Sequence, residues 1–328
     1  QRQMCIRDRY CGICHSDIHQ ARSDWREETY PIVPGHEIVG EVVQVGSGVT
    51  RFKVGDIAGV GCMVNACRHC EYCENDQEQY CMEGRVLTYS DKDLYHDNEI
   101  TRGGYSTNMV VDESFAIRVP KDAPLEKVGP LMCAGITTWS PIMQCGIKAG
   151  DKVGVAGFGG LGHMAVQYLV SLGAEVTVFD ITEEKRADAL RLGAKRYVNV
   201  TREEEMQGLD NTLRFILSTI PASYDPMMYI NILKVGGTLA VVGMPAVKDA
   251  PQINITALQN RYLTTSIIGG IKETQEVVDY SVAHGIYPET VVIPADASAI
   301  DKAYRDVVDG KVKFRYVIDL KTIKTEKQ

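Results

Sequence analysis

The stretch that decides the fold is KVGVAGFGGLGHMAVQYLVSLGAEVTVFD, residues 152–180. It begins with an apolar segment, 153–156, that we predict to be a buried strand, and an amphipathic helical pattern follows the last glycine of the turn. Between the two, glycines form a G-x-G-G-x-G turn that leaves backbone N–H groups at a helix N-terminus open to a pyrophosphate. The stretch therefore predicts a dinucleotide-binding βαβ unit.

The second strand of this unit, EVTVFD, ends in Asp180, eighteen residues after Gly162. An acid at this place suits the two ribose hydroxyls of NAD and repels the 2′-phosphate of NADP. Lys185 could hold a phosphate or a ribose hydroxyl, or simply lie on a solvated helix face. We predict NAD as the cofactor, with NADP as the alternative.

The segments on either side of this unit predict two kinds of sheet. RYVNV, LRFILST, GGTLAVVG and YLTTSIIGG follow it, separated by helical or loop residues, and bring the predicted strands to six. This pattern predicts an α/β fold with a doubly wound parallel sheet. Before it, HEIVGEVVQVG, DIAGVGC and STNMVVDESFAIRVP are short, glycine-punctuated strands, typical of a small antiparallel β domain.

The composition limits the classes of function. A chain of 328 residues, 45% hydrophobic and 24% charged, is long enough for two domains. A net charge of −8 without a basic stripe argues against nucleic acid, and no run reaches the roughly 18 apolar residues that span a bilayer. No secretory signal is visible, so we expect a cytoplasmic protein whose ten cysteines serve metal binding or catalysis.

The first nine residues, QRQMCIRDR, carry three arginines and show neither strand alternation nor a capped helical stripe. A foreign leader is not part of the evolved fold and says nothing about it. We therefore expect residues 1–9 to be foreign and to have no functional role.

Four cysteines lie in CRHCEYCENDQEQYC, residues 67–81. Thiolates at x2 spacing on a tight loop can point at one tetrahedral zinc, and four of them leave no position for water. An iron–sulfur cluster or free thiols are the alternatives, but the last gap is x7 and no proline follows the fourth cysteine. We predict a structural zinc bound by Cys67, Cys70, Cys73 and Cys81.

Further candidate metal ligands are scattered through the chain: Cys14, His36 with Glu37, and Cys133. Taken singly, each is more often a small buried residue or a core histidine than a ligand. Together, two thiolates and one imidazole leave one zinc position open, as in a catalytic site. Asp17 could accept the other ring N–H of His36, or cap a loop.

Residues 10–320 resemble the zinc-dependent medium-chain alcohol dehydrogenases, specifically the cinnamyl alcohol dehydrogenase-like branch. The motifs that carry the resemblance are YCGICHSDIHQ, YPIVPGHEIVGEV, the four-cysteine loop, GGYSTNMVVDE, LMCAGITTWSP and GFGGLGH. The resemblance implies a GroES-like catalytic domain over 1–133, a Rossmann NAD(P)-binding domain over 134–270 and a segment over 271–328 that returns to the catalytic domain. Relatives begin earlier, with an apolar strand where this chain has QRQMCIRDR, so we expect the first strands to be missing.

The resemblance also implies roles for individual residues. Two zinc ions bind per chain, the catalytic one at Cys14, His36 and Cys133 beside Glu37. Ser16, His19 and Asp24 fall where the family has its proton relay, although a serine here could cap a helix and a histidine could lie on the surface. The implied cofactor contacts are Thr137, Gly157, Phe158, Gly159, Gly160, Leu161, Gly162, Asp180, Lys185, Thr219, Gly243, Ser266, Ile267, Ile268 and Arg315.

We therefore predict a zinc-dependent oxidoreductase that interconverts primary alcohols and aldehydes, aromatic or medium aliphatic, by hydride transfer to or from NAD(P). A polyol or sugar dehydrogenase of the same superfamily is one alternative. A zinc- and nucleotide-binding protein without turnover is another. The expected partners are a small-molecule substrate and further copies of the chain, in a homodimer or tetramer. Close relatives usually carry a small hydroxyl residue in place of Asp180 and prefer NADP, so this chain departs from their pattern.

Overall fold

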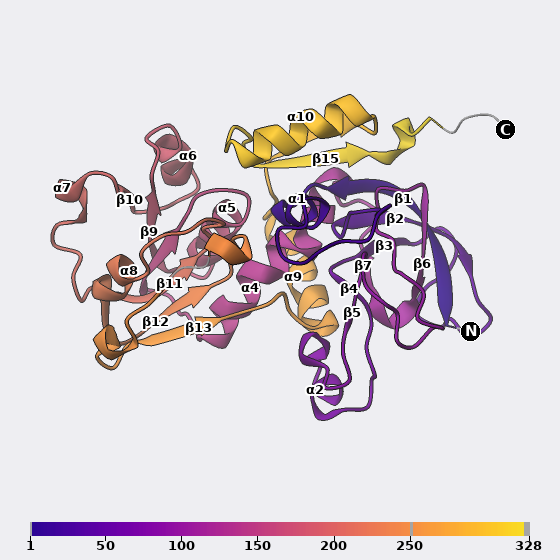
Figure 1. Ribbon diagram of the computed structural model, residues 1–328, viewed down its shortest axis with the longest axis horizontal. Coiled ribbons are helices and arrows are strands. Elements are labelled where there is room, and N and C mark those ends of the chain that lie inside the picture. Colours follow the sequence, from indigo (N-terminus) through magenta and orange to yellow (C-terminus); the bar gives the residue numbers. More distant parts are fainter. Residues whose placement is uncertain (1, 250–251, 325–328) are drawn as a thin grey trace. The chain divides into compact units, whose positions relative to one another are not determined.

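The computed structural model describes residues 2–249 and 252–324. The chain divides into two compact units: unit 1 comprises Gln1–Ile136 and Ile268–Gln328, and unit 2 comprises Thr137–Ile267 (Figure 1). Unit 2 is thus inserted into the sequence of unit 1. No helix among the described residues has both the length and the apolar character needed to cross a membrane.

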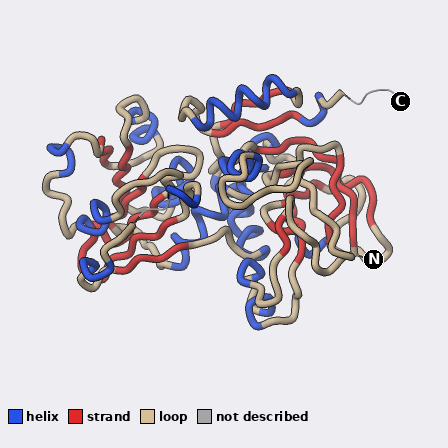
Figure 2. The backbone as a smooth tube through the Cα atoms, viewed as in Figure 1, coloured by secondary structure: helices blue, strands red, loops and turns tan. Residues whose placement is uncertain are grey.

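Unit 1 is built on a seven-stranded sheet of mostly antiparallel strands, with the order β14-β15-β1-β2-β3-β7 and with β6 paired to β1. Figure 2 shows these strands in red, joined by long loops. The strands of this sheet are β1 (Gln3–Gly12), β2 (Ile38–Val45), β3 (Ile57–Val60), β6 (Asn108–Asp112), β7 (Ala116–Val119), β14 (Thr290–Pro294) and β15 (Arg315–Asp319). A separate pair joins β4 (Met63–Asn65) to β5 (Val86–Leu87). The predicted antiparallel β domain is confirmed.

Strand β1 corrects the expectation for the first residues. Met4 and Ile6 are buried, and the strand pairs with β2 and β6 along most of its length. The expectation that this stretch forms no strand is therefore wrong for the described residues 3–9. The buried residues Met4, Ile6 and Asp8 alternate along the strand, as expected for one face of a sheet. Because the third of them is an aspartate, the sequence does not show this alternation as an apolar pattern.

Asp8 should make the stability of the protein depend on pH. Its side chain is buried, Oδ2 accepts a hydrogen bond from Ser106 Oγ at 3.0 Å, and Oδ1 has no partner among the described residues. Burial raises the pKa of Asp8 to about 7, above its ordinary value near 4 in an unfolded chain. The folded state thus holds the proton more tightly, and the free energy of unfolding falls as pH rises from about 4 through about 7.

We expect Asp8→Asn to remove this dependence. Integrating the shift gives a loss of about 2 kcal/mol in the parent between pH 5.5 and pH 7.5 that the variant does not show. Urea unfolding of both proteins at several pH values measures the difference. Parallel pH profiles would contradict the assignment.

Among the helices of unit 1, α3 contacts the central strands β1 and β2, and α9 contacts β7 (Figure 1). Helix α10 is the most amphipathic of them, and its first turn is capped by Asp296, which accepts from Ala299 N at 2.9 Å. The α-helices of unit 1 are α1 (His15–Ala21), α2 (Glu71–Glu74), α3 (Leu125–Val128), α9 (Ile271–His284) and α10 (Ala297–Val308), with α4 (Ala134–Gln144) running from unit 1 into unit 2.

Unit 2 is a six-stranded parallel sheet with the order β10-β9-β8-β11-β12-β13. The strands are β8 (Lys152–Ala156), β9 (Glu175–Asp180), β10 (Arg196–Asn199), β11 (Leu213–Ser218), β12 (Leu233–Val241) and β13 (Tyr262–Thr265). Its helices are α5 (Gly162–Ser171), α6 (Arg186–Arg191), α7 (Glu203–Met206) and α8 (Met227–Ile232). The order reverses between β8 and β11, so the predicted doubly wound sheet is confirmed.

Candidate metal centres and cofactor turn

Unit 1 brings together the scattered ligands of the open site. Cys14 precedes α1, His36 and Glu37 precede β2, and Cys133 precedes α4, and all four side chains are buried. The sulfurs of Cys14 and Cys133 are 3.9 Å apart, and His36 Nε2 lies 3.2 Å from the Cys133 sulfur. Two thiolates on one tetrahedral zinc lie about 3.8 Å apart, so the two sulfurs and the imidazole fit three positions of a zinc site, and a Glu37 carboxylate oxygen lies within 4.8 Å of them.

Asp17 holds the imidazole of this site in place. Its carboxylate is fully buried and faces His36 Nδ1 at 3.2 Å, which leaves Nε2 directed at the sulfurs. The same carboxylate accepts hydrogen bonds from the backbone N–H groups of Cys14 at 2.9 Å and Gly35 at 3.0 Å. One acid therefore orients two ligands at once, as the carboxylate partner of a ligating histidine does.

Glu37 and Arg315 form a buried ion pair beside the ligands. Arg315 Nη2 lies 3.4 Å from Glu37 Oε1, and Nη1 donates to the carbonyl of Ile13 at 3.2 Å. Burial raises the pKa of Glu37 to about 8, and the charge of Arg315 opposes this rise. The structure thus places Arg315, a predicted cofactor contact, next to the metal ligands.

The predicted relay residues lie on and after α1. Ser16 Oγ is 3.6 Å from the Cys14 sulfur, and His19 Nδ1 lies 2.8 Å from Asp24 Oδ2. His19 Nε2 is buried without a hydrogen-bond partner among the described residues, and its ring lies 5.1 Å from that of Trp25. The structure therefore joins His19 to Asp24, while no direct hydrogen bond between Ser16 and His19 occurs in the described chain.

The four-cysteine loop brings the sulfur atoms of its cysteines together. The sulfurs of Cys67 and Cys73 are 3.8 Å apart, and all four sulfurs lie within 4.8 Å of one another. Backbone N–H groups point at these sulfurs, from Cys70 to Cys67 at 3.3 Å and from Met82 to Cys70 at 3.5 Å. Four thiolates with N–H donors fit a zinc ion without an open position.

In unit 2 the glycine turn joins β8 to α5. Gly157 has φ +86°, and a Cβ on Gly162 would lie 2.0 Å from the carbonyl oxygen of Gly157, so the turn needs glycine at both places. A Cβ on Gly159 would meet nothing within 4 Å, which leaves the backbone open on that side. Phe158 is buried, whereas Gly160 and Leu161 are half-buried. The turn fits the approach of a pyrophosphate.

Asp180 fastens this turn to the end of β9. Oδ2 accepts from Phe158 N at 2.7 Å, and Oδ1 accepts from both the N–H and the hydroxyl of Thr182 at 3.0 Å. Lys185 Nζ lies 3.9 Å from Oδ2. The carboxylate is buried at the edge of the turn, and both of its oxygens accept hydrogen bonds from the chain.

The other predicted cofactor contacts lie in unit 2, with one exception. Thr219 donates from Oγ1 to the Gly157 carbonyl at 2.8 Å, and a Cβ on Gly243 would lie 2.2 Å from the Ile220 carbonyl oxygen. Thr137 is buried in α4, and Ser266 and Ile267 follow β13. The exception is Ile268, the first residue back in unit 1, which has φ +44°.

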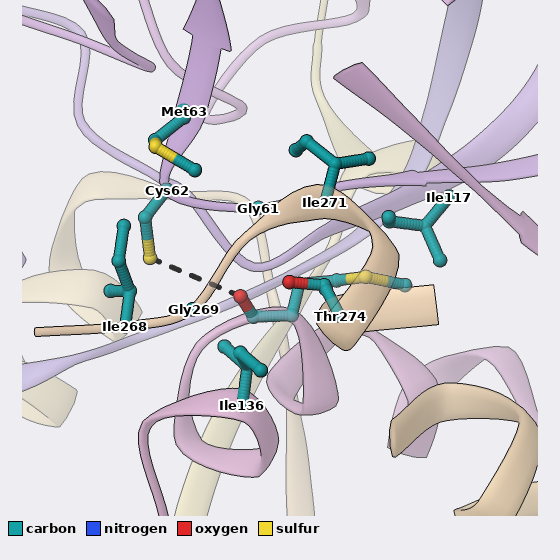
Figure 3. Close-up of a pocket in the computed structure, with 10 residues that line it drawn as sticks. Gly61, Cys62, Met63, Ile117, Ile136, Ile268, Gly269, Ile271 and Thr274 are labelled. Carbon is teal, nitrogen blue, oxygen red and sulfur yellow. Dashed lines mark hydrogen bonds between the residues drawn. The ribbon is translucent and has the colours of Figure 1, made fainter. Parts of the chain in front are cut away.

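The sequence reasoning missed two features of the metal centre. Cys62 lines a small pocket of about 10 Å³, and its sulfur is 3.9 Å from the carbonyl oxygen of Met132, the residue before Cys133 (Figure 3). Tyr105 faces Asp17 Oδ2 at 3.5 Å. Neither stands at a spacing that signals a metal site, and Cys62 in particular is a single cysteine in an apolar strand pattern.

Comparison with known proteins identifies relatives of this chain. Residues 1–121 match the family model "Alcohol dehydrogenase GroES-like domain" and residues 160–283 match "Zinc-binding dehydrogenase". The chain is 44% identical to a mannitol dehydrogenase of Petroselinum crispum, covering 97% of this chain and 94% of that one. A structure of CAD from Helicobacter pylori complexed with NADP(H) is 51% identical, with a TM-score of 0.93 over 98% of this chain and 92% of that one. A cinnamyl alcohol dehydrogenase from Sorghum bicolor is 36% identical, with a TM-score of 0.95 over 100% and 92%.

Proposed function

This chain belongs to the zinc-dependent medium-chain alcohol dehydrogenases, in the cinnamyl alcohol dehydrogenase-like branch, and from that premise we propose how its residues divide the work. It is a zinc-dependent oxidoreductase that interconverts alcohols and aldehydes with NAD(P). We propose primary alcohols and aldehydes with an aromatic or medium aliphatic group as substrates. The observation that carries the proposal is the buried three-ligand site of Cys14, His36 and Cys133, which leaves a fourth position for a substrate oxygen.

The protein residues prepare this site for both groups. When bound, zinc supplies a Lewis acid that lowers the pKa of an alcohol, and NAD(P) accepts or returns the hydride. Asp17 fixes the tautomer of His36 that directs Nε2 to the metal. The four cysteines of residues 67–81 hold a second, structural zinc.

We assign proton transfer to Ser16, His19 and Asp24. The hydroxyl of Ser16 lies beside the Cys14 sulfur and takes the substrate proton at Oγ. His19 carries it toward solvent, and Asp24 holds the imidazole at Nδ1, so that Nε2 faces the buried side. The missing direct bond between Ser16 and His19 requires a bridging hydroxyl or water between them.

Ser16→Ala should reduce kcat by roughly 10²–10⁴-fold, the range usual for a positioned proton-transfer group. Cofactor affinity should change little, because Ser16 lies in unit 1, outside the glycine turn. Steady-state kinetics with a fluorescence titration of the cofactor checks both parts. A kcat within twofold of the parent would remove Ser16 from the relay.

A polyol dehydrogenase is the second candidate function, since a mannitol dehydrogenase is among the relatives. Absorbance at 340 nm, followed with benzaldehyde-type, short aliphatic and polyol substrates, separates the two. Higher kcat/KM for mannitol than for any aldehyde would overturn our substrate class. Cofactor binding without turnover of any substrate would favour the third possibility, a binding protein that does not catalyse.

We propose that the enzyme prefers NAD, because Asp180 stands where the 2′-phosphate of NADP would approach. The structure of the Helicobacter pylori relative contains NADP(H), so the preference would distinguish this chain from that protein. We also propose that residues 271–328 complete the catalytic domain, which is consistent with the pairing of β15 and β1.

We propose a homodimer formed through β13, with a tetramer as the alternative. This strand is the edge of the parallel sheet, all four of its residues are exposed, and none is charged. Edge strands without charges offer free backbone groups to a second strand, and a two-fold axis pairs the two copies. Sedimentation velocity showing a monomer at micromolar concentration would contradict this.

We propose the cytoplasm as its location. All ten cysteines are free, as expected in a reducing compartment. Cell fractionation that recovers the enzyme elsewhere would contradict this proposal.

A further inference from the structure

Helix α9 receives its cap from a distant part of unit 1. The residue before its first turn is Gly270, which has no side chain to cap the helix. Instead, Glu78 Oε2 accepts a hydrogen bond from Ile271 N at 3.1 Å. A carboxylate at this end also complements the partial positive charge of the helix N-terminus.

The backbone around this cap fits closely. A Cβ on Gly270 would lie 1.9 Å from the carbonyl oxygen of Asp76 and 2.8 Å from Glu78 Oε2, so only glycine can approach the loop this closely. One residue further on, Lys272 Nζ lies 3.1 Å from Asp76 Oδ2. The helix start and the loop are therefore fitted to each other at three successive residues.

The loop that supplies the cap is the four-cysteine loop. Asp76 and Glu78 lie between Cys73 and Cys81, and their backbone bonds tie them to these ligands: Asp76 N donates to Cys73 O at 3.3 Å, and Cys81 N donates to Glu78 O at 3.0 Å. The position of the cap thus depends on the geometry that the zinc ligands impose.

A small cavity adjoins the helix start on its other side. The pocket of about 10 Å³ lies beneath it, lined by Ile268, Gly269, Ile271 and Thr274 opposite Cys62 (Figure 3). Ile268 has φ +44°, which is unfavourable for a β-branched residue.

We propose that Glu78 is a positioning residue for cofactor binding: by capping α9 it fixes the segment Ser266–Ile268 that leads into the helix, and it thereby couples the structural zinc loop to cofactor affinity. This inference rests on the proposed function, which assigns that segment to the cofactor. Loss of the cap loosens the segment in the free enzyme, so cofactor binding must order it again.

Glu78→Ala should raise the Kd for NAD about three- to tenfold, the range of losing a helix cap. The kcat at saturating cofactor should stay within twofold of the parent, because the catalytic ligands are untouched. Glu78→Gln should restore most of the affinity, since its amide oxygen still accepts from Ile271 N. The matched control is Glu83→Ala. This exposed acid lies 3.5 Å from His69 and within 4.8 Å of the Cys67 sulfur, but it has no hydrogen bond to α9 among the described residues, so the variant should bind NAD like the parent.

Fluorescence titration of NAD, with zinc content and melting temperature measured on the same samples, tests the inference. A lower melting temperature with an unchanged Kd would show a merely structural role and overturn it. Gly270→Ala provides a second variant, since its Cβ must push the loop from the helix without removing a charge. An unchanged Kd in this variant would also overturn the inference. Failure of the parent to bind NAD(P) or turn over substrate would instead count against the proposed function, because only the ratio of variant to parent tests Glu78.

Discussion

Cys133→Ser is expected to lower kcat/KM by roughly 10³-fold or more and to leave the protein folded. The substitution removes one of three ligands at a site with an open position, and a Lewis acid at such a site is worth several kcal/mol of transition-state stabilisation. Zinc content should fall from two ions to one per chain. Metal analysis, circular dichroism and the 340 nm assay on one sample measure all three.

The structural site gives the contrasting result. Cys73→Ser opens a closed four-thiolate shell on a polar loop, so it should lower the melting temperature, by about 2–4 °C for each kcal/mol lost, before it affects chemistry. Equal behaviour of the two variants would show that the structural and catalytic assignments are wrong. Fewer than two zinc ions per chain in the parent enzyme would also show that these assignments are wrong.

Asp180→Ser is expected to erode or invert the cofactor preference, chiefly through the KM for the cofactor. In the parent, a 2′-phosphate would meet the carboxylate at close range, and like charges about 4 Å apart repel by roughly 4 kcal/mol at an effective dielectric constant near 20. Lys185, 3.9 Å from the carboxylate, screens part of this, so we expect about tenfold or more discrimination for NAD. The ratio of kcat/KM for the two cofactors decides the matter.

Two further variants separate the charge of Asp180 from its hold on the glycine turn. Asp180→Asn keeps an acceptor for Phe158 N but removes the charge, so it should lose discrimination without losing NAD affinity to the extent that the serine variant does. Lys185→Ala should increase the preference for NAD. A parent that favours NADP would show that Lys185 and its neighbours outweigh the acid.

The parallel sheet could be predicted from the sequence because its signals are local. Most of the six strands are short apolar runs between helical or loop residues, and β8 is followed at once by the glycine turn. Strand β1 could not be predicted in this way, because the burial of one of its residues depends on tertiary structure and not on a local signal. Asp8 is buried there because the tertiary structure places it inward, and a polar residue at an inward position breaks the pattern that a sequence reading depends on.

The two metal centres also differ in whether their ligands lie close together in the sequence. The spacing of Cys67, Cys70 and Cys73 is enough by itself to predict a zinc site. Cys14 and Cys133 are 119 positions apart, so the sequence indicates them only as residue types that together suit a catalytic zinc, and the fold brings them into contact. The cap from Glu78 to Ile271 spans 193 positions and has no signal at either end, since a glutamate in a polar loop and a glycine before a helix are both ordinary.

The pairing of β1 with β15 bears on how the chain folds during synthesis. Tyr10 lies opposite Asp319, so the central strand of unit 1 pairs with a neighbour that is synthesised after all the other described strands. Unit 2 is continuous in sequence and can fold first, while residues 10–12 of β1 keep one edge open. The nascent enzyme therefore spends most of its translation with an unfinished sheet, and a chaperone that shields a strand edge would act on unit 1 rather than on unit 2.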